Sequence, residues 1–104
     1  MSNATVYLVV NITVDDAAEY KKYEKGFLGI LKKYGGSLIA LDDNAENFEG
    51  FSPRSGRMVI VGFPSEDIAK KWYSDSEYQK LSEHRRAGAH MEFLTMVRGV
   101  PPRQ

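Results

Sequence analysis

Hydrophobic positions near the start of the chain recur at every second residue over residues 5–14, which is the period of a β-strand. Both faces of this predicted strand are largely apolar. One face carries Val6, Leu8, Val10 and Ile12. The other face carries Tyr7, Val9, Asn11 and Thr13. A strand of this kind is expected to be covered on both sides.

Three further strands are predicted downstream. Residues 37–41 form a short one, and residues 91–97 form the last. Residues 57–63 carry a near-continuous apolar run, which is typical of a strand buried on both faces and therefore central in its sheet. The intervening residues 42–56 are polar and contain glycine and proline, so they predict a loop or an irregular hairpin.

After the first strand the apolar and aromatic positions change to helical spacing. They are Tyr20, Tyr23, Phe27, Ile30, Leu31 and Tyr34. Thr13 or Asp15 is expected to cap this helix, because a side-chain oxygen there accepts from free backbone N–H groups. Gly35 and Gly36 are expected to end it, since glycine readily adopts a positive φ.

A second helix is predicted after its expected N-cap, Ser65, which two acidic residues follow. Its inner face is expected to comprise Ile68, Ala69, Trp72 and Tyr73. Residues 74–76 interrupt the pattern with new capping side chains. We therefore predict a break there, followed by a second helical segment that carries Tyr78, Leu81 and Arg85.

The order βαββαβ predicts an α+β, ferredoxin-like fold, with a four-stranded antiparallel sheet and both helices on one face. Residues 5–99 are expected to form a single domain, which suits a chain of 104 residues. Residues 1–4 resemble the remnant of an expression tag. Residues 100–104 are expected to form a tail.

The sheet face without helices is predicted to be apolar, because the first and third strands carry apolar side chains on both faces. Large exposed apolar patches usually mark an interface. We therefore predict a homodimer that pairs through this face. The alternative is that Tyr7 and residues 42–56 fold over the face of a monomer.

Composition narrows the partners. Lys and Arg number 14, and Asp and Glu also number 14, so no positive field favours nucleic acid. The apolar run at residues 6–10 is too short to span a membrane, and a cytoplasmic location is the expectation. Cysteine is absent, and the two histidines, His84 and His90, have no carboxylate at metal-ligand spacing. We expect neither a metal nor a cofactor, with haem at His90 as the weakest alternative.

Dinucleotide-binding, P-loop, nucleophile-elbow and zinc-protease motifs are absent from the sequence. The remaining function classes are a ligand-binding or stress-linked dimeric scaffold, and a cofactor-independent enzyme acting on a small organic acid or a quinone-like substrate. Pocket volume discriminates them, because an open cavity with converging polar groups favours the enzyme and a filled core favours the scaffold.

A set of residues in the second half of the chain resembles the signature of the DUF1330 family, a small family of unknown function. They are Phe63, Pro64, Ser65, Ala69, Trp72, Tyr73, Ser76, Glu77, Tyr78 and Arg85. Upstream matches are Tyr20, Tyr23, Tyr34, Gly35, Gly36, Glu49 and Gly50. The resemblance runs from about Tyr7 to Gly99, and the chain departs from it at Arg98, where the family often has an acidic residue.

That family is similar to the dimeric α+β barrel superfamily. Its relatives include cofactor-independent monooxygenases, chlorite dismutase-like haem proteins, small isomerases and stress-response barrels. The resemblance therefore implies the fold and the dimer, and it leaves the chemistry open.

Arg85 is the first candidate for a binding site, because a guanidinium beside aromatic side chains presents a fork to a carboxylate or an enolate. It also matches the arginine of the family signature. The alternative is a surface ion pair with Glu77 or Glu83, or a contact to helix-end carbonyls.

Four other residues complete the predicted site. Trp72, Tyr78 and Tyr23 are expected to line an aromatic pocket, although aromatic residues at helical spacing are often plain core. Asn11 is an amide within an apolar strand, so it needs hydrogen-bond partners at the sheet edge or in a pocket. Together with Arg85, these residues are predicted to bind a small anionic or oxygenated molecule.

Overall fold

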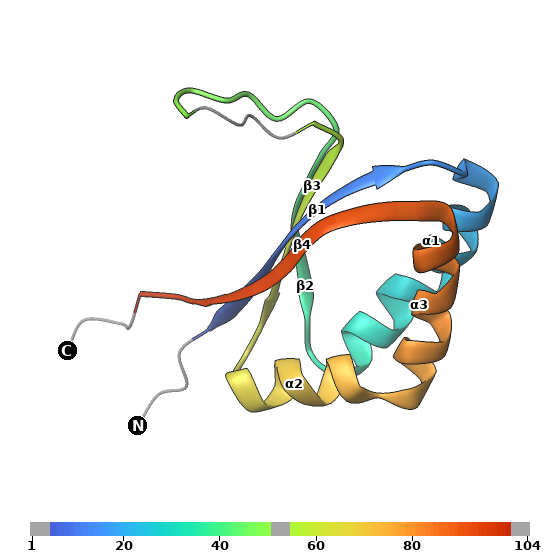
Figure 1. The fold of residues 1–104 in the computed structure, drawn as a ribbon. Coiled ribbons are helices and arrows are strands. Elements are labelled where there is room, and N and C mark those ends of the chain that lie inside the picture. The colour runs from blue at the N-terminus through green and yellow to red at the C-terminus, as the bar shows by residue number, and fades with distance from the viewer. Residues whose placement is uncertain (1–4, 51–54, 101–104) are drawn as a thin grey trace.

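The computed structural model describes residues 5–50 and 55–100, in which four strands form one antiparallel sheet with the helices on one side (Figure 1). The strands are β1 (Val6–Val14), β2 (Ser37–Asp42), β3 (Arg57–Phe63) and β4 (Ala89–Arg98). Their order is β2-β3-β1-β4, so β1 and β3 are central, and the central position predicted for β3 from its apolar run is confirmed. The ferredoxin-like α+β class is thereby confirmed. The expected tag remnant, and the tail beyond residue 100, lie outside the described residues.

The strand registers decide which side chains share a face. Val10 lies opposite Val59 on β3 and Leu94 on β4, on the face that the helices cover. Val9 lies opposite Ile60 and Thr95, on the other face. Because β1 and β3 carry apolar side chains on both faces, one group of these side chains lies in the core and the other lies on the open face of the sheet.

Helix α1 (Ala17–Lys33) begins one residue later than the sequence predicts. Its N-cap is Asp16, whose carboxylate accepts from the backbone N–H of Glu19 at 3.2 Å. Asp15 does not cap the helix, and neither does Thr13. The backbone N–H groups of Asp15 and Asp16 both donate to the carbonyl of Gly88, at 2.8 and 2.9 Å, which ties this turn to the end of the last helix.

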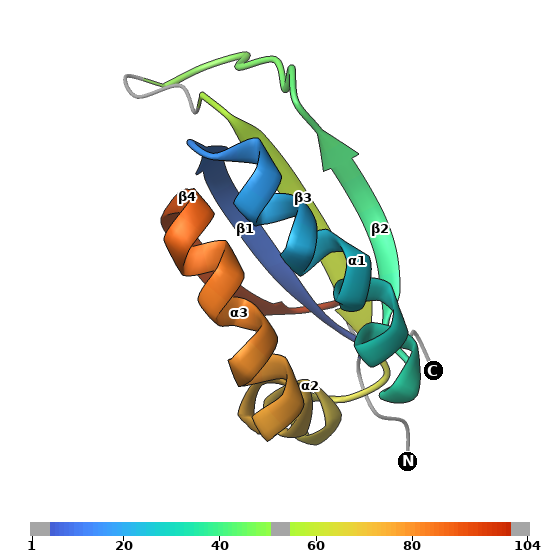
Figure 2. The same cartoon turned by 90° about the vertical axis from the view of Figure 1, so that its right-hand side faces the viewer.

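The end of α1 follows the prediction. Gly35 has a φ of +70°, the left-handed conformation that glycine adopts without steric cost. Figure 2 shows α1 lying beside α3 (Ser76–Gly88) over the sheet. Within residues 5–50 and 55–100, no helix combines the length and apolar character needed to cross a bilayer.

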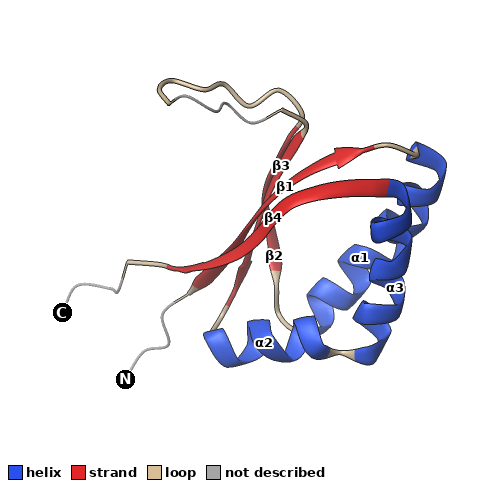
Figure 3. Cartoon of the chain, in the orientation of Figure 1, coloured by secondary structure: helices blue, strands red, loops and turns tan. Residues whose placement is uncertain are grey.

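The predicted break in the second helical region is confirmed. Helix α2 (Glu66–Ser74) ends at Asp75, and the same residue is the N-cap of α3 (Figure 3). Its carboxylate accepts from the backbone N–H groups of Glu77 at 2.7 Å and Tyr78 at 3.2 Å, and from the hydroxyl of Tyr34 at 2.5 Å. One side chain thus sets the angle between two helices and links them to the end of α1.

The core lies between the helices and the covered face of the sheet. Its largest fully buried side chains include Trp72, Tyr78 and Phe63. The prediction that Tyr73 belongs to the inner face of α2 is wrong, since its side chain is 42% exposed. Tyr73 follows Trp72 directly, so turning the larger indole inward places the tyrosine toward the helix flank.

Candidate functional site

A cavity of about 140 Å³ lies between the helices and the sheet. Each of the three helices and four strands contributes to its wall. Its aliphatic lining includes Val10, Ile12, Val59, Val61 and Leu94. Its aromatic lining comprises Tyr20, Tyr23, Phe27, Trp72 and Tyr78. The charged residues in the wall are Glu24, Arg57 and Arg85, so the cavity is an apolar chamber with a few ionic groups.

Arg85 is the buried charge of this chamber. It lies two turns after Tyr78 on the inner face of α3 and is only 5% exposed. Its Nη1 contacts the sulfur of Met91 at 3.5 Å, and its guanidinium carbon lies 5.7 Å from the ring centre of Tyr23. Its Nε has no hydrogen-bond partner, and no described carboxylate pairs with it.

The alternative for Arg85, a surface ion pair with Glu77 or Glu83, is therefore not found among the described residues. Glu77 instead lies 3.7 Å from the ammonium of Lys33. Arg85 also borders a wider hollow beside α2 and β4, about 710 Å³ in volume. A guanidinium in this position is able to form an ion pair with an anionic group of a bound molecule.

The aromatic side chains hold one another in place. The hydroxyls of Tyr23 and Tyr78 form a hydrogen bond of 2.9 Å, and the rings of Trp72 and Tyr78 lie 4.1 Å apart. Burial raises the pKa of Tyr23 well above its ordinary value, and it also raises the pKa of Tyr78. Both phenols are therefore neutral near pH 7 and act as hydrogen-bonding groups, not as bases.

Trp72 provides the second unsatisfied donor of the cavity wall. Its indole is buried, and its Nε1–H has no hydrogen-bond partner. Buried donors without partners are rare in folded proteins, because each costs the desolvation free energy of the group. The wall of one cavity thus contains two residues with an orphaned N–H group, Arg85 and Trp72.

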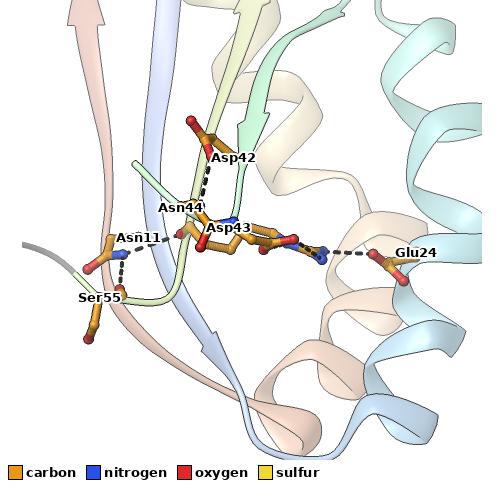
Figure 4. Close-up of polar contacts among 7 residues, drawn as sticks. Asn11, Glu24, Asp42, Asp43, Asn44 and Ser55 are labelled. Carbon is orange, nitrogen blue, oxygen red and sulfur yellow. Dashed lines mark hydrogen bonds and ion pairs between the residues drawn. The ribbon is translucent and has the colours of Figure 1, made fainter. Parts of the chain in front are cut away.

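The opening of the cavity lies between α1 and β2. Leu28 on α1 and both Leu38 and Leu41 on β2 line the cavity and are exposed, so they border its mouth. Arg57 lies at the same side, where its Nη1 donates to Glu24 at 2.9 Å and its Nε donates to Asp43 at 2.7 Å (Figure 4). These ion pairs connect α1, β3 and the start of the loop after β2.

The charges at the mouth are strongly stabilised by one another. The hydrogen bond from Arg57 holds the pKa of Asp43 below its ordinary value, and Asp43 in turn raises the pKa of Arg57. The group of Glu24, Asp43 and Arg57 therefore contains two carboxylates and one guanidinium. Near pH 7 its net charge is one negative unit.

Asn11 does not line the cavity. It is buried, and its Nδ2 donates to the carbonyl of Ser55 at 2.9 Å and to the carbonyl of Arg57 at 3.3 Å (Figure 4). Its amide thus ties the end of the β2–β3 loop to β1. The sequence predicts that this amide needs partners, and the backbone supplies them for Nδ2, whereas the buried Oδ1 has none. Because Asn11 is not part of the cavity wall, we leave it out of the site proposed below.

Sequence analysis missed the residues at the mouth. Arg57 carries a usable signal, because it is in phase with Val59 and Val61 and so points to the covered face of β3. Glu24 has no such signal, since an exposed acid on a helix is ordinary. In the described part of the chain, no group of three or more His, Asp or Glu side chains is arranged to hold a metal ion.

Arg98, where the chain departs from the family pattern, has a carboxylate partner. Its Nε donates to Glu66 on α2 at 2.9 Å, and Lys70 contacts the same carboxylate at 2.8 Å. This exposed cluster links the end of β4 to the start of α2, away from the cavity wall.

Solved structures with a similar fold come from several bacteria. A protein of unknown function from Rhodopseudomonas palustris superposes with a TM-score of 0.75 at 13% identity, covering 96% of this chain and 85% of that one. SnoaB, a cofactor-independent oxygenase from Streptomyces nogalater, has a TM-score of 0.62 at 13% identity, with 97% and 96% covered.

A third structure is a conserved protein of unknown function from Bacteroides thetaiotaomicron, described as a possible oxidoreductase. It has a TM-score of 0.64 at 17% identity, and the match covers 94% of this chain and 100% of that one. At these identities the likeness concerns the fold alone. No curated protein sequence matches this chain significantly.

The family assignment rests on the sequence itself. A model of the domain of unknown function DUF1330 matches residues 5–100, which is almost the whole chain. The residues that carry the resemblance include Trp72, Tyr78 and Arg85, and these three line the cavity. The chain belongs to the DUF1330 family.

Proposed function

We propose that the cavity binds a small organic molecule that carries an anionic or oxygenated group. Arg85 is the observation that supports this proposal most directly. Arg85 is buried, with 5% of the residue exposed, and no described carboxylate neutralises its guanidinium. An unpaired charge inside a protein costs several kcal/mol, so its retention favours a role in binding.

Trp72, Tyr23 and Tyr78 complete the proposed site. The rings supply an apolar wall, and the indole N–H of Trp72 supplies a second donor that has no partner in the described structure. Such a combination of an apolar cavity and a few polar groups is typical of small-molecule sites. The protein then acts as a binding module for that molecule.

Thermal unfolding with a panel of small carboxylates and phenols tests this proposal. A bound ligand raises the melting temperature of the wild type by mass action, and Arg85→Met is expected to remove that rise. Arg86→Met is the matched control, because Arg86 is exposed and bonds to Gln79 at 3.0 Å, outside the cavity wall. A panel without any stabilising compound contradicts the proposal.

The second candidate function is a cofactor-independent oxygenase or isomerase. Its support is the shared fold with SnoaB, together with a buried cation able to stabilise the anion of an activated substrate. Oxygen consumption, together with chromatography of the compound after incubation, discriminates the two functions for any compound that binds in the thermal assay. Turnover that is lost in Arg85→Met favours the enzyme, and binding without turnover favours the binding module.

We also propose that the protein pairs with a second copy through the open face of its sheet. Residues on this face include Tyr7, Val9, Ile39, Ile60 and Val97. Ile39 is 55% exposed and Val97 is 44% exposed, and none of these side chains carries a charge. A second copy is the partner that supplies an equally apolar surface.

The expected location of such a dimer is the cytoplasm. The absence of cysteine supports this proposal, since a reducing compartment offers no use for disulfides. Cell fractionation with an antibody against the native protein tests it directly.

A further inference from the structure

We infer that the ligand of this cavity is a monoanionic carboxylate with a single ring, bound with its carboxylate inward at Arg85 and its ring among the aromatic side chains. This inference rests on the proposed binding function and adds the class of the ligand and its orientation. Four features of the cavity carry it: its volume, its hydrogen-bond donors, its aromatic walls, and the charge at its mouth.

The volume limits the ligand to about one ring. The cavity measures about 140 Å³. An apolar protein cavity of about 150 Å³ accommodates one benzene molecule, so a fused two-ring acid exceeds the space available. Because buried protein interiors resist expansion, such a ligand would have to displace wall residues at a cost in affinity.

The donors select an anion with two acceptor atoms. The Arg85 Nε and the Trp72 Nε1 both lack partners, whereas the hydroxyls of Tyr23 and Tyr78 share one hydrogen bond. A carboxylate has two oxygens and only acceptor atoms, so it matches the fork of the Arg85 guanidinium without leaving a donor of its own unpaired. A neutral amide of the same shape offers one acceptor oxygen and no charge.

The walls around Arg85 favour a ring over a flexible chain. Tyr23 and Phe27 have ring centres 5.4 Å apart, and the rings of Phe27 and Trp72 are nearly perpendicular at 85°. Rings in offset or edge-to-face contact gain stabilisation beyond the area they bury. A rigid ring also loses less conformational entropy on binding than an alkyl chain with the same number of carbons.

The mouth disfavours a second anionic group. Glu24 lines the cavity, and it shares Arg57 with Asp43, so the ion-pair group there carries a net negative charge. A ligand whose first carboxylate lies at Arg85 would direct a carboxylate at the opposite end of its ring toward Leu28, Leu41 and Glu24. Like charge in a partly desolvated opening weakens binding.

Calorimetric titration of the wild type with four probes tests the class. Benzoate is the expected ligand, benzamide lacks the charge, terephthalate adds a second carboxylate, and 2-naphthoate adds a second ring. We expect benzoate to bind at least about tenfold more tightly than each of the other three, which corresponds to the loss of one charged hydrogen bond. Equal or tighter binding of any of the three overturns the assigned class.

Substitutions of Arg85 and Glu24 check the orientation. Arg85→Lys retains the charge but not the fork, so it is expected to retain part of the benzoate affinity, whereas Arg85→Met abolishes it. Glu24→Gln on α1 is expected to reduce the difference in affinity between benzoate and terephthalate. Glu83→Gln, at an exposed position on α3, is the control and is expected to leave that difference unchanged. An unchanged difference in Glu24→Gln overturns the outward placement of the second carboxylate.

The outcomes separate this inference from the function on which it rests. If benzamide or 2-naphthoate binds well and requires Arg85, the cavity binds small molecules and only the class is wrong. If none of the four probes binds, and a wider panel of carboxylates and phenols also fails to stabilise the wild type, the binding function itself is wrong.

Discussion

At the scale of single residues, three buried side-chain polar atoms of the described residues have no hydrogen-bond partner, and two of them belong to the cavity wall while the third is Asn11 Oδ1. Asn11 Nδ2 bonds to two backbone carbonyls, and Tyr23 bonds to Tyr78. Arg85 Nε and Trp72 Nε1 have no partner, and both residues line the cavity. Unsatisfied buried groups lower stability, so their presence in a cavity wall indicates that the site was selected for something other than stability.

The first prediction concerns the stability of Arg85→Met without ligand. A methionine of similar length removes an uncompensated buried charge, whose desolvation costs several kcal/mol. The contact with the Tyr23 ring, 5.7 Å from the guanidinium carbon, offsets at most about 2 kcal/mol of that cost. We therefore expect the free energy of unfolding in urea to rise by about 1 kcal/mol. A loss of stability would indicate a structural role for Arg85.

The second prediction concerns the pair of hydroxyls. Tyr23→Phe and Tyr78→Phe each leave one buried hydroxyl without its partner, so each is expected to lower the free energy of unfolding by about 1–2 kcal/mol. The double substitution removes both polar groups and is expected to cost less than the sum of the two. Urea unfolding of the four proteins measures this coupling, and strictly additive losses would contradict it.

Four residues of the cavity wall could be predicted from the sequence, but the residues at the mouth of the cavity could not. Trp72, Tyr78, Tyr23 and Arg85 have a local signal, since they combine aromatic or cationic chemistry with helical spacing. Glu24 and Asp43 become relevant only because β3 places Arg57 between them. A contact across 33 residues depends on the packing of α1 on the sheet, which no local pattern encodes.

At the scale of the elements, the helix break illustrates what local chemistry decides. Ser-Asp-Ser at residues 74–76 predicts the break, and Asp75 ends α2 and begins α3. The start of α1 was predicted less well, because Asp15, Asp16 and Thr13 are all capable caps. The choice of Asp16 depends on the carbonyl of Gly88, which lies far along the sequence.

The third prediction concerns the ion pair that links β4 to α2. Hydrogen bonds from Arg98, and then from Lys70, lower the pKa of Glu66 from 4.5 to about 2. A carboxyl whose pKa is lower in the folded state stabilises the fold fully above its unfolded pKa, and it loses this contribution as the pH falls through its folded pKa. Arg98→Gln is therefore expected to be slightly less stable than the wild type at pH 7.

The difference between Arg98→Gln and the wild type is expected to shrink between pH 4.5 and about pH 2, where the Glu66 carboxyl gains its proton. Urea midpoints at pH 7, 4.5 and 2.5 measure this change. Arg86→Gln is the control, since Arg86 bonds to the neutral side chain of Gln79 and its effect is expected to vary little with pH. A difference that persists unchanged at pH 2.5 would contradict the assigned partner.

At the scale of the whole molecule, the arrangement has one covered and one open sheet face. The helices lie on the covered face, as Figure 1 shows, and the cavity lies between them and the sheet, while most side chains on the open face are uncharged. This asymmetry was visible in the sequence, because β1 and β3 are apolar on both faces.

The fourth prediction is that Ile60→Glu converts a dimer into a monomer. Ile60 lies in the middle of the open face, opposite Val9 on β1 and Ala40 on β2, and it is half-buried in the single chain. A carboxylate there remains hydrated in a monomer but would be desolvated without a partner in a paired sheet, which costs more than such an interface gains from one residue. Light scattering after size exclusion at micromolar protein is expected to give twice the chain mass for the wild type and the single mass for Ile60→Glu. Ala18→Glu, which adds the same charge to an exposed position near the start of α1, is expected to remain a dimer. A monomeric wild type, or an unchanged mass in Ile60→Glu, would show that the open face is not the site of self-association.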